Sequence, residues 1–171
     1  MKLIISENSK ELGKAAAAEI AARLNSAISA NNYARIVLST GASQFEMFEA
    51  LIYEKVDWGK VEMFHLDEYI GLPDTHKASF CKYLNERFVS KVPLYKANLI
   101  QTRGDIDAVK QNISEKLLAC PVDVGVIGIG ENSHIAFNDP PADFKTQDPY
   151  IIVNLDENCK RQQVREGWFE N

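Results

Sequence analysis

The sequence predicts an α/β protein with a doubly wound, mostly parallel sheet and helices on both faces. Short β-branched apolar runs alternate along the chain with longer segments in which apolar residues recur every three or four positions. The apolar runs are continuous, which is typical of strands buried on both faces. With 171 residues and neither repeats nor a linker, the chain is expected to form a single domain, residues 1–171.

The first half of the chain is expected to form two strands and two helices. Residues 2–5 are a short candidate strand. An apolar residue at every fourth position from Leu12 to Ile28 predicts a helix over residues 9–28. The run 35–38 predicts a buried strand, and a small-residue turn leads from it into a second helix. The apolar face of that helix consists of Phe45, Phe48, Leu51 and Ile52.

The second half continues the alternation. Residues 61–66 predict a strand and residues 78–89 a helix rich in aromatic side chains. Residues 105–118 predict another helix, because their apolar residues are in helical phase. Residues 123–127 and 150–153 predict two further strands. Trp168 and Phe169 resemble core residues, but no predicted element follows them to pack against.

The composition is that of an ordinary globular protein, 46% hydrophobic and 25% charged. A net charge of −5 and no run of Lys and Arg argue against a nucleic-acid partner. No segment reaches membrane-spanning length and no signal peptide is recognisable, so no membrane partner is expected. Cys81, Cys120 and Cys159 are odd in number and widely spaced, which predicts free thiols and a cytoplasmic protein.

Three polar loops follow predicted strands, and such loops line the ligand crevice of an open α/β sheet. The first, residues 38–44, reads LSTGASQ. Main-chain N–H groups and hydroxyls in a small-residue turn before a helix suit an anion such as phosphate. An ordinary tight turn with Ser43 as the helix N-cap is equally favoured. No Gly-Lys-Ser/Thr follows, so this is not a Walker loop.

The second loop, residues 64–73, reads FHLDEYIGLP. Asp67 stands where the strand ends, and a carboxylate there suits proton abstraction from a carbon next to a carbonyl or imine. The alternative is an aspartate that only stabilises the turn. A metal site formed by His65, Asp67 and His76 is disfavoured, because the ligands are mixed and not regularly spaced. No metal is therefore expected.

The third loop, residues 128–140, reads GIGENSHIAFNDP. His134 lies within five residues of three polar groups, so it is placed to exchange protons with a sugar hydroxyl or ring oxygen near neutral pH. These neighbours are Glu131, Asn132 and Asp139. The glycines do not complete a dinucleotide fingerprint, because the third position is Ser133.

Together and in this order, the three loops resemble those of the glucosamine-6-phosphate deaminase/isomerase family, which is related to the 6-phosphogluconolactonases. The family patterns are PTGxTP, MDEY-x-GL and GxGxDGHIAFNEP, and here the segments read STGASQ, LDEYIGLP and GIGENSHIAFNDP. Residues 76–80 resemble a further family element. The resemblance covers nearly the whole chain. It implies an enzyme of amino sugar catabolism that converts glucosamine 6-phosphate, or a related hexosamine phosphate, to ketose 6-phosphate and ammonia.

The resemblance also implies roles for individual residues, with no cofactor. Asp67 would move a proton between C2 and C1 through an enolamine. His134 would open the pyranose ring, supported by carboxylates of its own loop. The partner would be a small-molecule sugar phosphate, and a homo-oligomer is compatible with the family. The residues assigned to substrate or phosphate binding are Thr40, Gly41, Ala42, Ser43, Glu68 and one of Lys160 and Arg161.

The chain departs from the family pattern in ways that bear on function. Asn132 stands where the family has an aspartate, and an amide cannot stabilise an imidazolium as a carboxylate does. The other departures are Ala42, Gln44, Ser133 and Asp139. The domain is also expected to lack the family's C-terminal part. The alternatives are a non-catalytic sugar-phosphate sensor of the same fold and a 6-phosphogluconolactonase-like hydrolase.

Overall fold

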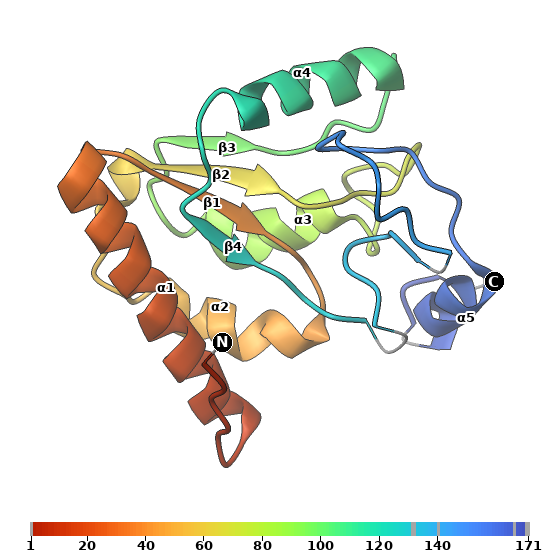
Figure 1. Ribbon diagram of the computed structural model, residues 1–171. Helices are drawn as coiled ribbons and strands as arrows, with labels where there is room; N and C mark the ends of the chain where they lie inside the picture. The colour runs from red at the N-terminus through yellow and green to blue at the C-terminus, as the bar shows by residue number, and fades with distance from the viewer. Residues whose placement is uncertain (1, 131–132, 140, 166, 170–171) are drawn as a thin grey trace.

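In the computed structural model, which describes residues 2–130, 133–139, 141–165 and 167–169, four strands form one sheet. Their order is β3-β2-β1-β4, and neighbouring strands are parallel (Figure 1). The carboxyl ends of the strands therefore meet at one edge, which confirms the predicted parallel α/β sheet. The strands are β1 (Ala34–Leu38), β2 (Val61–His65), β3 (Lys96–Asn98) and β4 (Val124–Val126).

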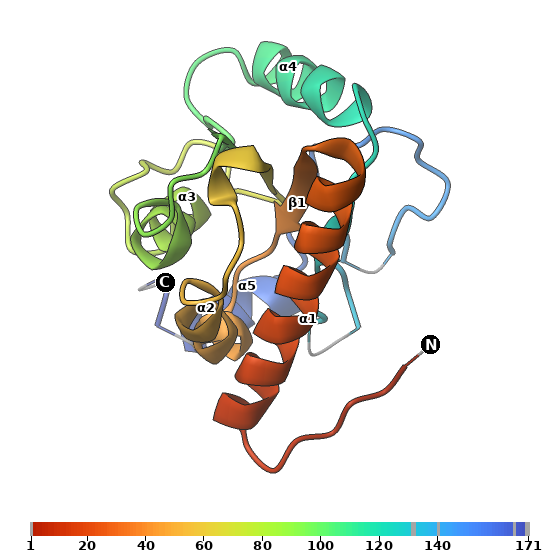
Figure 2. The ribbon, with the colours of Figure 1, turned by 90° about the vertical axis from the view of Figure 1, so that its left-hand side faces the viewer.

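Helices cover both faces of the sheet (Figures 1 and 2). Three helices pack with β1 and β2 into the larger core on one face, and α4 covers the other. The α-helices are α1 (Ser9–Asn31), α2 (Phe45–Leu51), α3 (Phe80–Leu84), α4 (Ile106–Leu118) and α5 (Glu157–Arg165). Three shorter helical segments are η1 (Ala42–Gln44), η2 (Trp58–Lys60) and η3 (Asn85–Val89). Among the described residues, none of the helices is long and apolar enough to cross a membrane.

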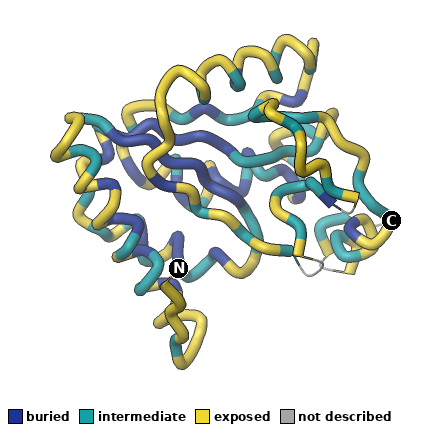
Figure 3. Tube along the Cα trace, viewed as in Figure 1, coloured by how far each residue is buried: buried dark blue, intermediate teal, exposed yellow. Residues whose placement is uncertain are grey.

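The strands at the centre of the sheet are buried along their whole length (Figure 3). Because successive side chains of a strand point to opposite faces, β1 contributes to two cores. Ile36 belongs to the larger core together with α1, α2 and α3. Val37 belongs to the smaller core, where Phe64 and Ile113 of α4 surround it. Continuous apolar strands thus become buried on both sides, as the sequence predicts.

Helix α1 extends three residues beyond its predicted end. Asn8 caps its start by accepting a hydrogen bond from the Glu11 N–H at 2.9 Å, and Asn32 ends it in the left-handed conformation with φ 59°. Gly13 sits where α1 crosses the start of α2. A Cβ at this position would lie 2.6 Å from the main-chain carbon of Glu46, so only glycine permits this close approach.

Arg35 connects the sheet to the end of α4 from a position that is 2% exposed. Its guanidinium donates hydrogen bonds to the carbonyls of Lys116 at 2.5 Å and Leu117 at 2.9 Å, and also to the carbonyl of Cys120. It forms an ion pair with Glu62 at 3.2 Å. The last carbonyls of a helix have no partner within the helix, so this arginine supplies donors to groups that the helix leaves unsatisfied.

Two predicted strands are wrong and one strand was not predicted. Residues 2–5 form no strand, because they reach no strand edge, and Leu3 and Ile5 are exposed. Residues 150–153 run beside the sheet instead of joining it, and Tyr150 packs on the smaller core. Strand β3 is too short and polar to be recognised from its sequence. It is held by Asn98, whose side chain donates to Glu62 at 2.9 Å and to the Met63 carbonyl at 3.2 Å.

Candidate active site

The three polar loops meet around a cavity of about 300 Å³ at the carboxyl ends of β1, β2 and β4. The cavity is lined by the turn of residues 40–43, called the phosphate-type turn below, and by Asp67 and His134. Residues from the start of α3 and from the C-terminal part of the chain complete its wall. These additional lining residues, which the sequence analysis did not assign to the site, include Lys77, Ser79, Tyr83, Gln162, Gln163 and Trp168.

The turn at residues 40–43 presents main-chain N–H groups that are free to bind an anion. Gly41 adopts φ 132°, a conformation that favours glycine. Within the described parts of the chain, the N–H groups of residues 40–43 have no hydrogen-bond acceptor. Ser43 is not an N-cap, because η1 starts after Gly41 and neither η1 nor α2 has a side-chain cap. The prediction of Ser43 as an N-cap is therefore wrong.

Ser39 joins this turn to the histidine loop. Its hydroxyl accepts a hydrogen bond from the Gly128 N–H at 3.0 Å and another from the side-chain amide of Gln44. The Ser39 N–H donates to the Val126 carbonyl at 3.1 Å. Gln44 stands where the family pattern has proline, and here its amide holds the two loops in a common position. A serine directly after the strand was the only sequence signal for this link.

Tyr83 holds the same turn from α3, because its hydroxyl donates to the Gly41 carbonyl at 2.7 Å. We expect Tyr83→Phe to weaken the binding of inorganic phosphate about three- to tenfold, the effect of losing one hydrogen bond of about 1 kcal/mol that fixes the turn. Isothermal titration calorimetry would measure the change. Tyr53→Phe is the matched control, since Tyr53 is 84% exposed. Equal affinities for the Tyr83 variant and the parent would contradict this role.

Asp67 lies at the end of β2 with its carboxyl in the cavity wall. Burial, and secondarily repulsion by Glu68, raises the pKa of Asp67 to about 7. In the described chain, its carboxylate accepts no hydrogen bond from a main-chain N–H, so the alternative of a turn-stabilising aspartate lacks support. A carboxylate with a pKa near the working pH is suited to act as a base that also returns its proton.

Because its pKa is raised, Asp67 lowers the free energy of unfolding when it is ionised above neutral pH. Its ordinary pKa is 3.8, so the protonated group favours the folded state fully below about pH 4, and this contribution is lost as the pH rises toward 7. We therefore expect Asp67→Asn to be more stable than the parent at pH 8, by about 1 kcal/mol or more, and to lose this advantage near pH 4. Urea unfolding at both pH values tests this. An advantage independent of pH would show that Asp67 is not the titrating group.

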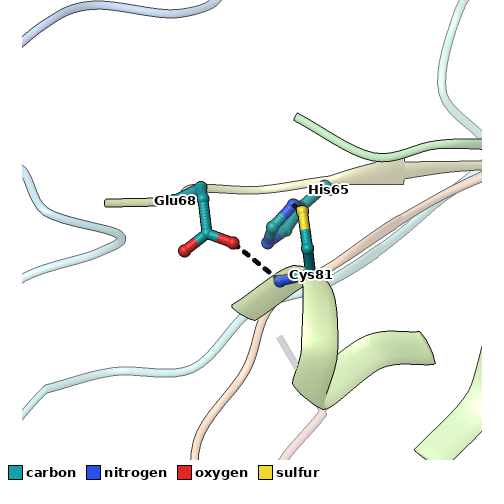
Figure 4. A group of neighbouring side chains, drawn as sticks. All are labelled: His65, Glu68 and Cys81. Atoms are coloured by element: carbon teal, nitrogen blue, oxygen red, sulfur yellow. Dashed lines mark hydrogen bonds between the residues drawn. The ribbon is translucent and has the colours of Figure 1, made fainter. Parts of the chain in front are cut away.

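Glu68 caps the start of α3, where its carboxylate accepts a hydrogen bond from the Cys81 N–H (Figure 4). Its carboxylate accepts hydrogen bonds from the N–H groups of Tyr69 and Phe80 at 2.9 and 3.1 Å. It also accepts from the N–H of Cys81 at 2.7 Å and from the Ser79 hydroxyl at 3.1 Å. A carboxylate is well placed at a helix N-terminus, where the N–H groups lack partners. The structure therefore does not bring Glu68 to the cavity with the other predicted substrate-binding residues.

His65, Glu68 and Cys81 place possible ligand atoms within 4.8 Å of one another (Figure 4). These groups already have other contacts. Glu68 caps α3, and the Cys81 thiol donates to the Ile100 carbonyl at 3.1 Å. Burial raises the pKa of Cys81, which keeps the thiol protonated, and burial lowers the pKa of His65 to about 3. The contacts of Glu68 and Cys81 are those of a capped helix start, and they occupy the atoms that would bind a metal ion. His76 instead accepts a hydrogen bond from the Ala78 N–H and stacks on Phe169, apart from His65 and Asp67.

Asp139 orients His134. The imidazole Nδ1 lies 2.9 Å from the Asp139 Oδ1, and Asp139 is buried. Gly130 leaves room for the ring, since a Cβ there would lie 2.2 Å from the His134 Cε1. Ser133, a glycine in the family pattern, adopts φ 69° and so carries backbone strain. The predicted residues Glu131 and Asn132 lie outside the described part of the chain. A carboxylate that holds one ring nitrogen fixes the orientation of the imidazole for proton transfer.

Helix α5 contributes Gln162 and Gln163 to the cavity wall, but Lys160 and Arg161 of the same helix do not line the cavity. Lys160 forms an ion pair with Glu157 at 2.7 Å, and Arg161 donates to the Asn158 side chain at 2.6 Å. Neither residue lines the cavity of the phosphate-type turn. Lys160 lines an adjoining cavity of about 510 Å³, as Glu68 does, and Asp67 lines both cavities. The ring centroids of Phe169 and Tyr69 lie 5.3 Å apart, so Phe169 packs against an aromatic side chain of an earlier loop.

Comparison with known proteins shows the family to which this chain belongs. The family described as glucosamine-6-phosphate isomerases/6-phosphogluconolactonase matches residues 7–165. A glucosamine-6-phosphate deaminase of Staphylococcus saprophyticus is 32% identical over 161 residues, covering 89% of this chain and 65% of that protein. One from Staphylococcus epidermidis is 32% identical over 177 residues, covering 98% and 70%.

A solved structure of a monomeric glucosamine-6-phosphate deaminase is similar to the fold with a TM-score of 0.86. The two chains are 25% identical, and the match covers 97% of this chain and 70% of that one. The chain thus spans about two thirds of the length of the relatives that it matches. The match over residues 7–165 shows that this chain belongs to the glucosamine-6-phosphate isomerase/6-phosphogluconolactonase family.

Proposed function

We propose that the chain carries the catalytic centre of an isomerising deaminase that acts on glucosamine 6-phosphate or a related hexosamine phosphate. One observation supports this function above others. A single cavity contains free main-chain N–H groups, a carboxyl with a pKa of about 7 and a histidine paired with a carboxylate. The names of the curated relatives agree with this chemistry.

Each group in the cavity would perform one step. The N–H groups of residues 40–43 would bind the phosphate and so fix the sugar. His134, oriented by Asp139, would exchange the proton needed to open the pyranose ring. Asp67 would take the proton from C2 of the open-chain aldose and return it to C1 through an enolamine. The aldehyde oxygen gains the proton that the amine loses, which leaves a C1 hydroxyl and an imine at C2. Addition of water to that imine would release ammonia and leave the ketose phosphate.

The setting of this activity follows from the same chemistry. The substrate is a small-molecule sugar phosphate, and the reaction belongs to amino sugar catabolism. The three cysteines are free in the structure, which supports a cytoplasmic location. Assembly into a homo-oligomer and the weakening of ring opening by Asn132 stay predictions.

The test is ammonia release from a panel of hexosamine 6-phosphates, run beside hydrolysis of 6-phosphogluconolactone and a binding measurement. We expect ammonia and ketose phosphate in equal amounts from at least one hexosamine phosphate. Lactone hydrolysis without ammonia release would favour the hydrolase. Tight binding of a sugar phosphate with neither product would favour a sensor of the same fold.

A further inference from the structure

We infer that Lys77 supplies the positive charge that binds the phosphate group of the substrate. This inference rests on the site proposed above and adds a residue to it. Among the described residues that line the cavity of the phosphate-type turn, Lys77 is the only lysine or arginine. Its side chain is exposed, and no described carboxylate forms an ion pair with it. A phosphate monoester carries a charge of about −1.5 to −2 near neutral pH, so a nearby free cation will be attracted to it.

The main chain around Lys77 is held in place by its neighbours. The Ala78 N–H donates to His76 Nδ1 at 3.1 Å, and the Ser79 N–H donates to the His76 carbonyl at 3.0 Å. Ser79 then caps α3 by accepting from the Lys82 N–H at 3.3 Å. Lys77 therefore projects from a fixed position next to a helix start, and only its flexible side chain must adjust to a ligand.

Helix α3 connects this position to the phosphate-type turn. Tyr83, on the same helix, donates its hydroxyl proton to the Gly41 carbonyl at 2.7 Å and stacks on Phe45 with ring centroids 5.7 Å apart. Lys77 and Tyr83 line the cavity together with residues 40–43. The lysine and the free N–H groups are thus parts of one wall held by the same helix, and they are able to act on one anion.

The other nearby cations have different contacts. The Arg87 guanidinium lies 3.8 Å from the centre of the Phe45 ring, outside the residues that line the cavity. Lys160 and Arg161 are engaged with Glu157 and Asn158. In addition, the cavity contains Asp67, which will repel a phosphate dianion when ionised. A cation in the cavity wall offsets that repulsion, and Lys77 meets this need.

The experiment compares binding of glucosamine 6-phosphate and of inorganic phosphate to the complete chain and its variants by isothermal titration calorimetry. We expect Lys77→Met to raise both dissociation constants about tenfold, in line with the loss of one charge-assisted contact. Lys77→Arg should bind nearly as well as the parent. The difference between Lys77→Met and the parent should shrink at high salt, since exposed charges are screened.

Two lysine variants of equal charge serve as comparisons. Lys82→Met removes a lysine from α3 itself, where Lys82 lies 3.9 Å from Glu86 and does not line the cavity, so its affinity should equal that of the parent. Lys160→Met tests the family-based alternative. Unchanged affinity in Lys77→Met, equal losses in Lys77→Met and Lys82→Met, or a loss confined to Lys160→Met would each overturn the inference.

The readout separates this inference from the proposed reaction, because binding requires no turnover. If phosphate binding depends on Lys77 but no hexosamine phosphate releases ammonia, the proposed function fails and the role of Lys77 stands. If ammonia is released and Lys77→Met binds as the parent does, the proposed function stands and the role of Lys77 fails. A parent chain that binds neither inorganic phosphate nor a sugar phosphate would overturn the Lys77 inference.

Discussion

Asp67→Asn is expected to lower the kcat of ammonia release by about 10³-fold, within the range that general base catalysis contributes. The amide has nearly the shape of the carboxyl but cannot accept the C2 proton. The affinity for glucosamine 6-phosphate should change less than about threefold, because the proposed phosphate site is the turn formed by residues 40–43 and does not include Asp67. Steady-state kinetics and calorimetry together separate the two quantities.

The matched control is Asp74→Asn, an exposed aspartate beyond the same strand end, which should keep the kcat of the parent. The pH dependence gives a second check. With a pKa of about 7, Asp67 should produce an increase in kcat/KM as the pH rises through neutrality. Turnover of Asp67→Asn within tenfold of the parent would assign the proton transfer to another group.

Arg35→Met is expected to lower the free energy of unfolding by about 3–5 kcal/mol, as breaking a buried ion pair from one side does. The substitution removes a partner of Glu62, which is 8% exposed, and leaves the last carbonyls of α4 without their donor. The guanidinium also lies 4.5 Å from the centre of the Phe64 ring, so packing is lost as well. Urea unfolding at neutral pH measures the effect.

Arg23→Met provides the comparison for Arg35. Arg23 pairs with Glu19 at 2.7 Å, but both side chains are largely exposed, and such a pair contributes about 0–1 kcal/mol. A loss below about 1 kcal/mol for Arg35→Met would mean that the end of α4 finds other donors. Loss of ammonia release without loss of stability would instead point to an unrecognised link from this cluster to the active site.

The strand ends of the site could be predicted because their signals are local. A continuous apolar run followed by small or polar residues marks where a buried strand stops, and this placed Asp67 and His134 at one edge of the sheet. The same reasoning failed at residues 150–153. Their apolar run is typical of a buried strand, but only Tyr150 of this segment belongs to the smaller core, Ile152 and Val153 are exposed, and no strand forms.

The fold class, the order of the main helices and the residue types of the three loops were determined by the sequence alone. They follow from hydrophobic periodicity and from side-chain chemistry, which are properties of neighbouring residues. The tertiary structure decided which side chains face each other. It assigned Glu68 to the start of α3, paired His134 with Asp139 and placed Lys77 in the cavity wall. The contacts of Glu68 and Lys77 depend on how α3 packs onto the sheet, so no local pattern of residues encodes them.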